Sequence, residues 1–145
     1  MANVKPSLTI KRRFKASPAQ VYAAWTQPEQ LAKWMGPLGT TAAEAEADVR
    51  VGGRYHFRMI VPGDEHNVSG VYREVIPNEK LVFTWAWRTL PKERESLVTV
   101  HLKPDGDGGT IMTFTHEQFF DEKARDDHET GWTGTFTKLE TYLNG

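Results

Sequence analysis

Large apolar residues recur at every second position along several runs of the chain. The clearest run is residues 80–88, which carries Leu81, Phe83, Trp85 and Trp87 at alternate positions. Successive side chains of a strand point to opposite faces, so these four are predicted to lie on one face. Similar alternation predicts further strands at residues 8–14, 55–61, 68–76, 98–102 and 112–116. The β pattern begins at Thr40, and Gly52-Gly53 separates a first run that ends near Val51 from the strand that carries Tyr55. Consecutive strands joined by short polar turns are typical of an antiparallel meander.

Two turn signals set the limits of these strands. Asp105-Gly106-Asp107-Gly108-Gly109 predicts a hairpin turn. Pro62-Gly63-Asp64-Glu65 predicts a turn before the strand that begins at Val68. His66 is therefore expected in a loop.

Two short helices are predicted between the first strand and the rest of the meander. Ser17-Pro18-Ala19-Gln20 combines a serine N-cap, a proline at the first helical position and a glutamine that completes a capping box. Thr26-Gln27-Pro28-Glu29 repeats this start signal, and Leu31, Trp34 and Met35 form the apolar stripe that follows. Neither helix is long enough to be stable alone.

The last segment, from about Asp121 to Leu143, predicts one long helix with Asp121 as its N-cap. Its apolar residues lie on one helical face: Trp132, Phe136, Leu139 and Leu143. Gly131 and Gly134 are unexpected there, because each costs about 1 kcal/mol relative to alanine in a helix interior. A packing or spatial requirement should explain them.

The large apolar groups of the strands and of the last helix are expected to face one another. They are Tyr55, Phe57, Met59, Phe83, Trp85, Trp87, Met112 and Phe114 from the strands, and Trp132 and Phe136 from the helix. A solid core is one interpretation, and a pocket for a small molecule is the other. Polar residues expected on the same side favour the pocket: Arg12, Tyr72, Glu74, His116 and His128. Trp34 of the second short helix is counted with the ligand-binding candidates.

Arg12 has two interpretations. It can form a structural ion pair with Glu74, or it can receive a carboxylate or enolate of a ligand. His116 and His128 are expected to meet at the mouth of the pocket, although each alone is more often a satisfied or surface histidine. No histidine pair has the spacing of zinc ligands, so neither a metal nor another cofactor is expected.

Composition excludes several classes of function. The 145 residues carry a formal net charge of −1, which argues against nucleic acid and anionic membranes as partners. Without cysteine there is no disulfide and no thiol nucleophile. We expect one cytoplasmic domain over residues 1–145, as a monomer or a weak homodimer.

Motifs along nearly the whole chain carry a family resemblance. They are Arg12-x-Phe14-x-Ala16, Val21-x-x-x-Trp25, Pro28-Glu29-x-Leu31-x-x-Trp34-Met35-Gly36-Pro37, Asp48-x-Arg50-x-Gly52-Gly53-x-Tyr55, Gly70-x-Tyr72-x-Glu74-Val75-x-Pro77-x-x-Lys80-Leu81-Val82-Phe83-Thr84-Trp85 and Gly131-Trp132. The chain resembles the SRPBCC (START-like) superfamily, in the group of activator of heat-shock protein 90 ATPase homologues. This resemblance implies an α+β helix-grip fold, in which a curved antiparallel sheet wraps around a long C-terminal helix with a cavity between them.

Three functions are compatible with this resemblance, because the superfamily contains binders, transporters and enzymes. The favoured one is binding of a small hydrophobic or amphipathic ligand in the cavity. The second is catalysis of the polyketide-cyclase or hydratase type, with His116, Glu74 and Tyr72 as acid–base candidates. The third is a co-chaperone-like module in the stress response, with a chaperone as partner.

Overall fold

The computed structural model describes residues 5–91 and 94–144 of the chain. The elements in chain order are β1 (Leu8–Phe14), α1 (Pro18–Thr26), α2 (Pro28–Trp34), β2 (Ala42–Ala47), β3 (Arg54–Val61), β4 (Asp64–Ile76), β5 (Lys80–Trp87), β6 (Ser96–Asp105), β7 (Gly109–Glu117) and α3 (Glu122–Asn144).

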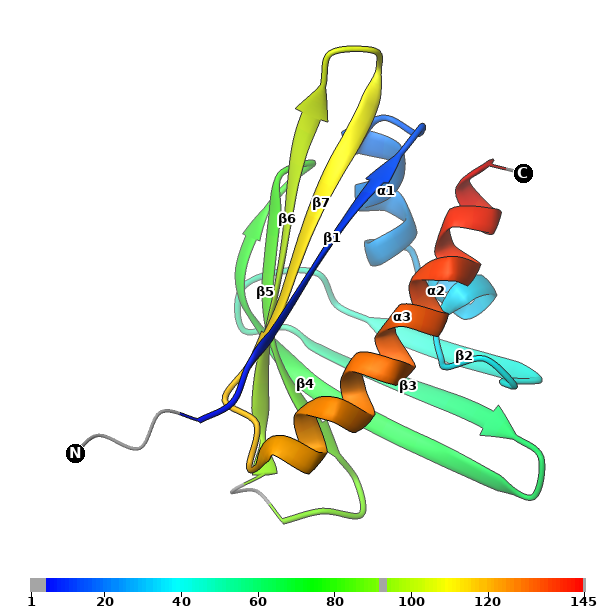
Figure 1. Ribbon diagram of the computed structural model, residues 1–145, viewed down its shortest axis with the longest axis vertical. Coiled ribbons are helices and arrows are strands. Elements are labelled where there is room, and N and C mark those ends of the chain that lie inside the picture. The colour runs from blue at the N-terminus through cyan, green and yellow to red at the C-terminus, as the bar shows by residue number, and fades with distance from the viewer. Residues whose placement is uncertain (1–4, 92–93, 145) are drawn as a thin grey trace.

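All seven strands belong to one antiparallel sheet with the order β1-β7-β6-β5-β4-β3-β2. Strands β2 to β7 are neighbours in sequence order, and β1 joins the sheet beside β7. Figure 1 shows the strands fanning apart, with α3 running diagonally across one side of the curved sheet. Helices α1 and α2 lie near the C-terminal half of α3. The α+β class and the antiparallel meander predicted from the sequence are therefore confirmed. Within the described ranges, every helix is too short or too polar to pass through a bilayer.

Local side-chain contacts fix the helix starts that the sequence predicted. The Ser17 hydroxyl accepts the Gln20 N–H at 3.2 Å, and the Gln20 side chain accepts the Ser17 N–H at 2.9 Å. Asp121 likewise accepts the Ala124 N–H at 2.8 Å and caps α3. These contacts satisfy backbone donors that the first turn of a helix leaves unpaired. Thr26 does not cap α2, because its hydroxyl donates to the Tyr22 carbonyl of α1 instead.

The turn between β3 and β4 is shorter than the sequence suggested. Strand β4 begins at Asp64, directly after Gly63, and Asp64 pairs with Val61. Gly63 has φ of 78°, a left-handed conformation that glycine adopts at little cost and that the residue after proline takes in a type II turn. The expectation that His66 lies in a loop is therefore wrong. His66 is a strand residue opposite Met59.

The core fills most of the space between the sheet, α1, α2 and α3. Trp25 of α1 lies at its centre, with its ring 4.7 Å from that of Trp34 and 6.2 Å from that of Phe114. Phe114 in turn contacts Trp132 and Phe136 of α3, at ring distances of 4.5 and 4.9 Å. All five aromatic side chains are buried. Most of the predicted aromatic wall is therefore solid core.

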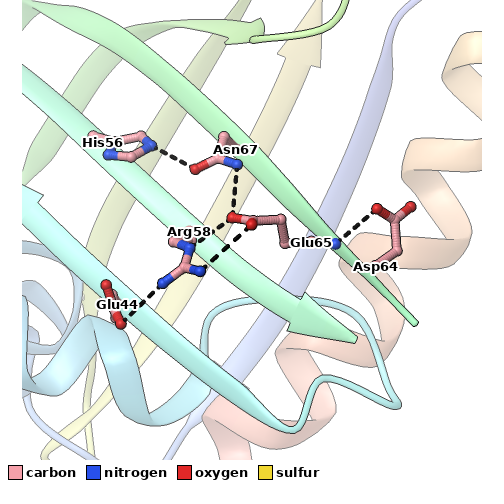
Figure 2. A network of polar contacts seen from close by, with 6 residues as sticks. All are labelled: Glu44, His56, Arg58, Asp64, Glu65 and Asn67. Carbon is pink, nitrogen blue, oxygen red and sulfur yellow. Dashed lines mark hydrogen bonds and ion pairs between the residues drawn. The ribbon is translucent and has the colours of Figure 1, made fainter. Parts of the chain in front are cut away.

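The opposite, outward face of β2, β3 and β4 carries a network of polar side chains, shown in Figure 2. Arg58 of β3 lies between Glu44 of β2 and Glu65 of β4, with its Nε 2.6 Å from a Glu65 oxygen. Asn67 donates to Glu65 at 3.2 Å, and its amide oxygen lies 2.9 Å from Nε2 of His56. Hydrogen bonds from Arg58 and Asn67 lower the pKa of Glu65 to about 2. The network links the three strands across their solvent-exposed side.

Candidate functional site

A pocket of about 490 Å³ lies between the N-terminal half of α3, one end of β3, β4 and β5, and the loop that follows α2. Its lining residues are Met35, Gly36, Pro37, Met59, His66, Trp85, Trp87, Thr89, Leu90, Asp127, His128, Thr130, Gly131, Trp132 and Thr135. Met35, Met59, Trp85 and Trp132 are buried and form its inner part, whereas His66, Leu90, Asp127 and Thr130 are exposed and mark its rim. The pocket is thus apolar inside and polar at its opening, as small-molecule sites usually are.

Three tryptophans form the main wall of this pocket. Trp85 and Trp87 lie two residues apart on β5, with ring centroids 5.5 Å apart and planes at 89°. Trp132 of α3 faces Trp85 at 4.9 Å and 52°. Strand alternation places both β5 indoles on the concave side of the sheet, and the curvature of the sheet brings them against the helix. Their rings therefore face the pocket from two different elements.

His128 connects α3 to β5 at the edge of the pocket. Nδ1 lies 2.7 Å from the Ala124 carbonyl oxygen, and the Trp87 indole N–H donates to Nε2 at 2.8 Å. A carbonyl only accepts and an indole N–H only donates, so Nδ1 carries the proton and the ring is neutral. Burial lowers the pKa of His128, and the Ala124 hydrogen bond and Asp127 offset this only in part.

His116 of β7 occupies a similar position deeper in the protein. The Trp132 indole N–H donates to Nδ1 at 3.0 Å, and Nε2 lies 2.6 Å from the Ser96 hydroxyl. Nε2 therefore carries the proton and donates to Ser96, which donates in turn to the Trp85 carbonyl at 3.3 Å. Burial, together with the neighbouring His128, holds the pKa of His116 well below its ordinary value.

The two histidines meet, as expected from the sequence, but not at the mouth of the pocket. Their ring centroids are 5.1 Å apart with planes at 77°, and the Phe119 ring lies within 4.9 Å of both. His128 lines the pocket, but His116 is fully buried behind it and does not. Each imidazole accepts one indole N–H and donates its own proton elsewhere. The pair is therefore a neutral, fully hydrogen-bonded connection between β7, β5 and α3.

The pocket brings together five of the residues proposed from the sequence: Met59, Trp85, Trp87, His128 and Trp132. Nine others are buried in the core and do not line it: Trp34, Tyr55, Phe57, Tyr72, Phe83, Met112, Phe114, His116 and Phe136. The Trp34 indole N–H is satisfied by the Ala24 carbonyl at 3.0 Å. Tyr55 donates its hydroxyl to the Thr84 carbonyl.

The ion pair between Arg12 and Glu74, one of the two interpretations of Arg12, does not form. Arg12 reaches α3, where it lies 3.4 Å from a Glu140 oxygen and donates to the Thr133 carbonyl at 3.4 Å. Glu74 pairs with Lys80 at 3.3 Å. The pairing of β4 with β5 shifts register between Tyr72 and Glu74. Simple alternation had placed Tyr72 and Glu74 on the same face of the sheet, and it fails at this shift. Neither Arg12 nor Glu74 lines the pocket.

These positions bear directly on the acid–base set proposed for catalysis. His116 is buried behind the pocket, Tyr72 is in the core and Glu74 pairs with Lys80 at the surface, so the three do not converge. Burial raises the pKa of Tyr72 far above its ordinary value, which keeps its hydroxyl protonated. No group of three or more His, Asp or Glu side chains in residues 5–91 and 94–144 is arranged to hold a metal ion.

Sequence reasoning missed three parts of the pocket. They are the loop Met35-Gly36-Pro37, the rim formed by His66, Thr89 and Leu90, and the α3 residues Asp127, Thr130 and Thr135. On α3, the sequence signal that could have located the pocket was the unexpected glycine at position 131. Gly131 lines the pocket, and a Cβ there would meet no atom within 4 Å. Gly134 has a different reason, since its Cβ would lie 2.8 Å from Cγ of Leu38 in the loop after α2.

A curved antiparallel sheet with a long C-terminal helix lying across it and two short helices after the first strand is the helix-grip fold. The sequence model described as "Activator of Hsp90 ATPase homolog 1-like protein" matches residues 15–144, and the chain belongs to this family. The SRPBCC resemblance seen in the motifs is thereby confirmed.

Individual relatives are more distant. The human "Activator of 90 kDa heat shock protein ATPase homolog 1" is 27% identical over 93 residues, which cover 64% of this chain and 24% of the human protein. The chain thus matches about a quarter of that relative's length.

Solved structures resemble this chain over nearly its whole length. Protein CV1439 from Chromobacterium violaceum has a TM-score of 0.84 at 26% identity, covering 96% of this chain and 97% of that one. The AHSA1 protein from Silicibacter pomeroyi has a TM-score of 0.80 at 26% identity, covering 96% and 98%. A protein from Arthrobacter aurescens has a TM-score of 0.83 at 25% identity, covering 95% and 86%.

Proposed function

We propose that this protein binds a small hydrophobic or amphipathic molecule in the pocket between α3 and the sheet. The observation that carries the proposal is a pocket of about 490 Å³ whose inner wall is made of tryptophan and methionine side chains. The volume lies within the range of small-molecule sites, about 300–1,000 Å³. Gly131 supports the proposal, because a residue unfavourable in a helix interior lines the open space.

Apolar burial supplies the driving force in this proposal. A ligand that buries about 300 Å² of apolar area gains roughly 7 kcal/mol, at about 25 cal/mol per Å². Ordering and association costs remove several kcal/mol of this gain. The net gain of about 4 kcal/mol corresponds to a dissociation constant of roughly 1 mM for such a ligand, and a ligand that buries more apolar area binds more tightly.

The experiment uses Nile red, an uncharged dye whose fluorescence rises in apolar surroundings, with wild type and two variants. Gly131→Leu adds a side chain at the pocket lining, and Thr137→Leu adds the same side chain at an exposed position of the same helix. We expect wild type and Thr137→Leu to bind the dye and Gly131→Leu to bind it at least about tenfold more weakly. Equal binding by all three, or no binding by wild type, contradicts the proposal. Native mass spectrometry of the freshly purified protein then searches for the natural ligand.

A second candidate function is a co-chaperone-like interaction with a heat-shock protein 90 chaperone. Family membership and the match to part of the human ATPase activator favour it. The test is a pull-down with the purified chaperone followed by an assay of its ATPase rate. An unchanged rate and no retained chaperone reject this function without affecting the ligand-binding proposal.

The setting proposed for either function is the cytoplasm, with residues 1–145 as one domain in a monomer or weak homodimer. A formal net charge of −1 supports a role without nucleic acid. Light scattering of the purified protein at several concentrations measures the oligomeric state.

A further inference from the structure

We propose that the pocket selects amphiphiles with a cationic, ammonium-type head group and disfavours anionic ones; this inference rests on the proposed ligand-binding function. Among the lining residues that the structure describes, Asp127 is the only aspartate, glutamate, lysine or arginine. It lies exposed at the rim, next to His128 on α3. A guest with its apolar part in the pocket therefore places its head group near a carboxylate.

Three cationic side chains on the elements around the pocket have partners of their own, and none of the three is among its lining residues. Lys138 of α3 donates to the Met35 and Pro37 carbonyls, at 3.4 Å each. Arg12 is held by Glu140 and by the Thr133 carbonyl. Lys123 pairs with Asp127 itself at 2.9 Å, but its side chain is 83% exposed, so a guest cation can displace it at little cost.

The one histidine that is hydrogen-bonded at the pocket wall does not supply a positive charge. His128 donates from Nδ1 to the Ala124 carbonyl and accepts the Trp87 indole N–H at Nε2. A protonated ring would present a second N–H to an indole N–H, which cannot accept it. The groups that face His128 from the packed elements are Trp87 of β5, His116 of β7 and Asp127 of α3 itself. His66 of β4 lies at the rim of the pocket, with its ring 6.1 Å from that of Trp87.

Trp87 adds a second attraction for a cation, because it lines the pocket and is half-buried, whereas Trp85 and Trp132 are buried inside, where the apolar part of a guest lies. The face of an indole attracts a cation that lies over it. The negative face of the indole repels a carboxylate for the same electrostatic reason. Asp127 and Trp87 therefore favour the same sign of charge in the head group.

The test compares three compounds with the same eight-carbon chain: octyltrimethylammonium, 1-octanol and octanoate. Each is titrated against bound Nile red at pH 8, where an unperturbed histidine is neutral and a carboxylate is charged. We expect octyltrimethylammonium to displace the dye at a concentration about tenfold below that needed for octanoate, with 1-octanol between them.

Two charge variants test whether the Asp127 carboxylate causes the preference for the cationic compound. Asp127→Asn is expected to reduce the preference to about threefold, leaving the contribution of the Trp87 indole. Asp126→Asn removes the same charge one residue earlier on α3, from an exposed side chain that pairs with Arg125 and does not line the pocket, and it should leave the preference unchanged. Equal displacement by the three compounds, tighter octanoate, or equal effects of the two variants overturns the inference while ligand binding stands. A protein that fails to bind Nile red at all overturns the binding function itself.

Discussion

Trp87 of β5 donates its indole N–H to Nε2 of His128 on α3 at 2.8 Å, across the edge of the pocket. The bond joins a residue near the end of a strand to a helix residue 41 positions later in the chain. It exists only while the imidazole is neutral, because Nδ1 already donates to the Ala124 carbonyl. Trp132 and His116 repeat the relationship one layer deeper, at 3.0 Å. The attachment of α3 to the sheet therefore depends on the protonation state of two histidines.

We predict that the free energy of unfolding decreases as the pH falls below about 6.5. The folded protein lowers the pKa of His116 and His128 below the unfolded value of 6.5, so the unfolded chain binds more protons in that range. The stability from both groups is fully present above pH 6.5 and is lost as the pH falls toward their folded values. Urea titrations between pH 5.5 and 8 measure this, a range in which the lowered pKa of Glu65 has little influence. A double variant His116→Gln, His128→Gln should show a flatter dependence, and an equally steep one contradicts the assignment.

Trp132→Phe is predicted to destabilise the protein by about 1–3 kcal/mol, since it leaves Nδ1 of the buried His116 without a donor. In the wild type, the indole N–H of Trp132 stabilises the neutral imidazole of His116. Removing this donor should therefore raise the pKa of His116. Chemical denaturation measures the first effect, and the pH dependence of the imidazole NMR signals measures the second. Trp87→Phe is the partly exposed counterpart and should have the smaller effect on stability.

The two glycines of α3 are predicted to respond differently to alanine. Gly131→Ala should stabilise the protein by about 1 kcal/mol, because alanine is the better helix former and its Cβ would meet no atom within 4 Å. Gly134→Ala should gain less or lose stability, since its Cβ would lie 2.8 Å from Cγ of Leu38 and 3.4 Å from the Leu38 backbone nitrogen. Thermal unfolding of the two variants side by side gives the comparison. A larger gain at Gly134 would show that the loop after α2 yields without cost.

Arg58→Gln is predicted to raise the pKa of Glu65 from about 2 toward its ordinary value of 4.5. The hydrogen bond from Arg58 is the largest cause of the lowered pKa, and the contact from Asn67 remains in the variant. Carboxyl NMR signals followed from pH 1.5 to 6 measure the change. Arg54→Gln, at an exposed position on the same strand, is the control and should leave the pKa of Glu65 where it is.

Patterns of period two and 3.6 made much of this protein predictable from its sequence. The alternation in residues 80–88, the capping box at Ser17 and the cap at Asp121 each determine a local structure, because the physical cause lies within a few residues. Between Tyr72 and Glu74, prediction from alternation failed, because the pairing of β4 with β5 shifts register there. A register shift depends on the partner strand, and a simple alternation therefore assigned Glu74 to the wrong side.

By itself the sequence determined the strands, the helices, the family and which large side chains turn inward. Only the tertiary structure decided which of those side chains fill the core and which line a pocket. Phe114 and Trp87 look alike in a pattern of alternating residues, yet one is fully buried and the other lies at an opening. The reason is that a cavity is a property of the distance between packed elements, here α3, the ends of β3 to β5 and the loop after α2. Periodicity along one chain segment records the direction of a side chain and not what stands opposite it.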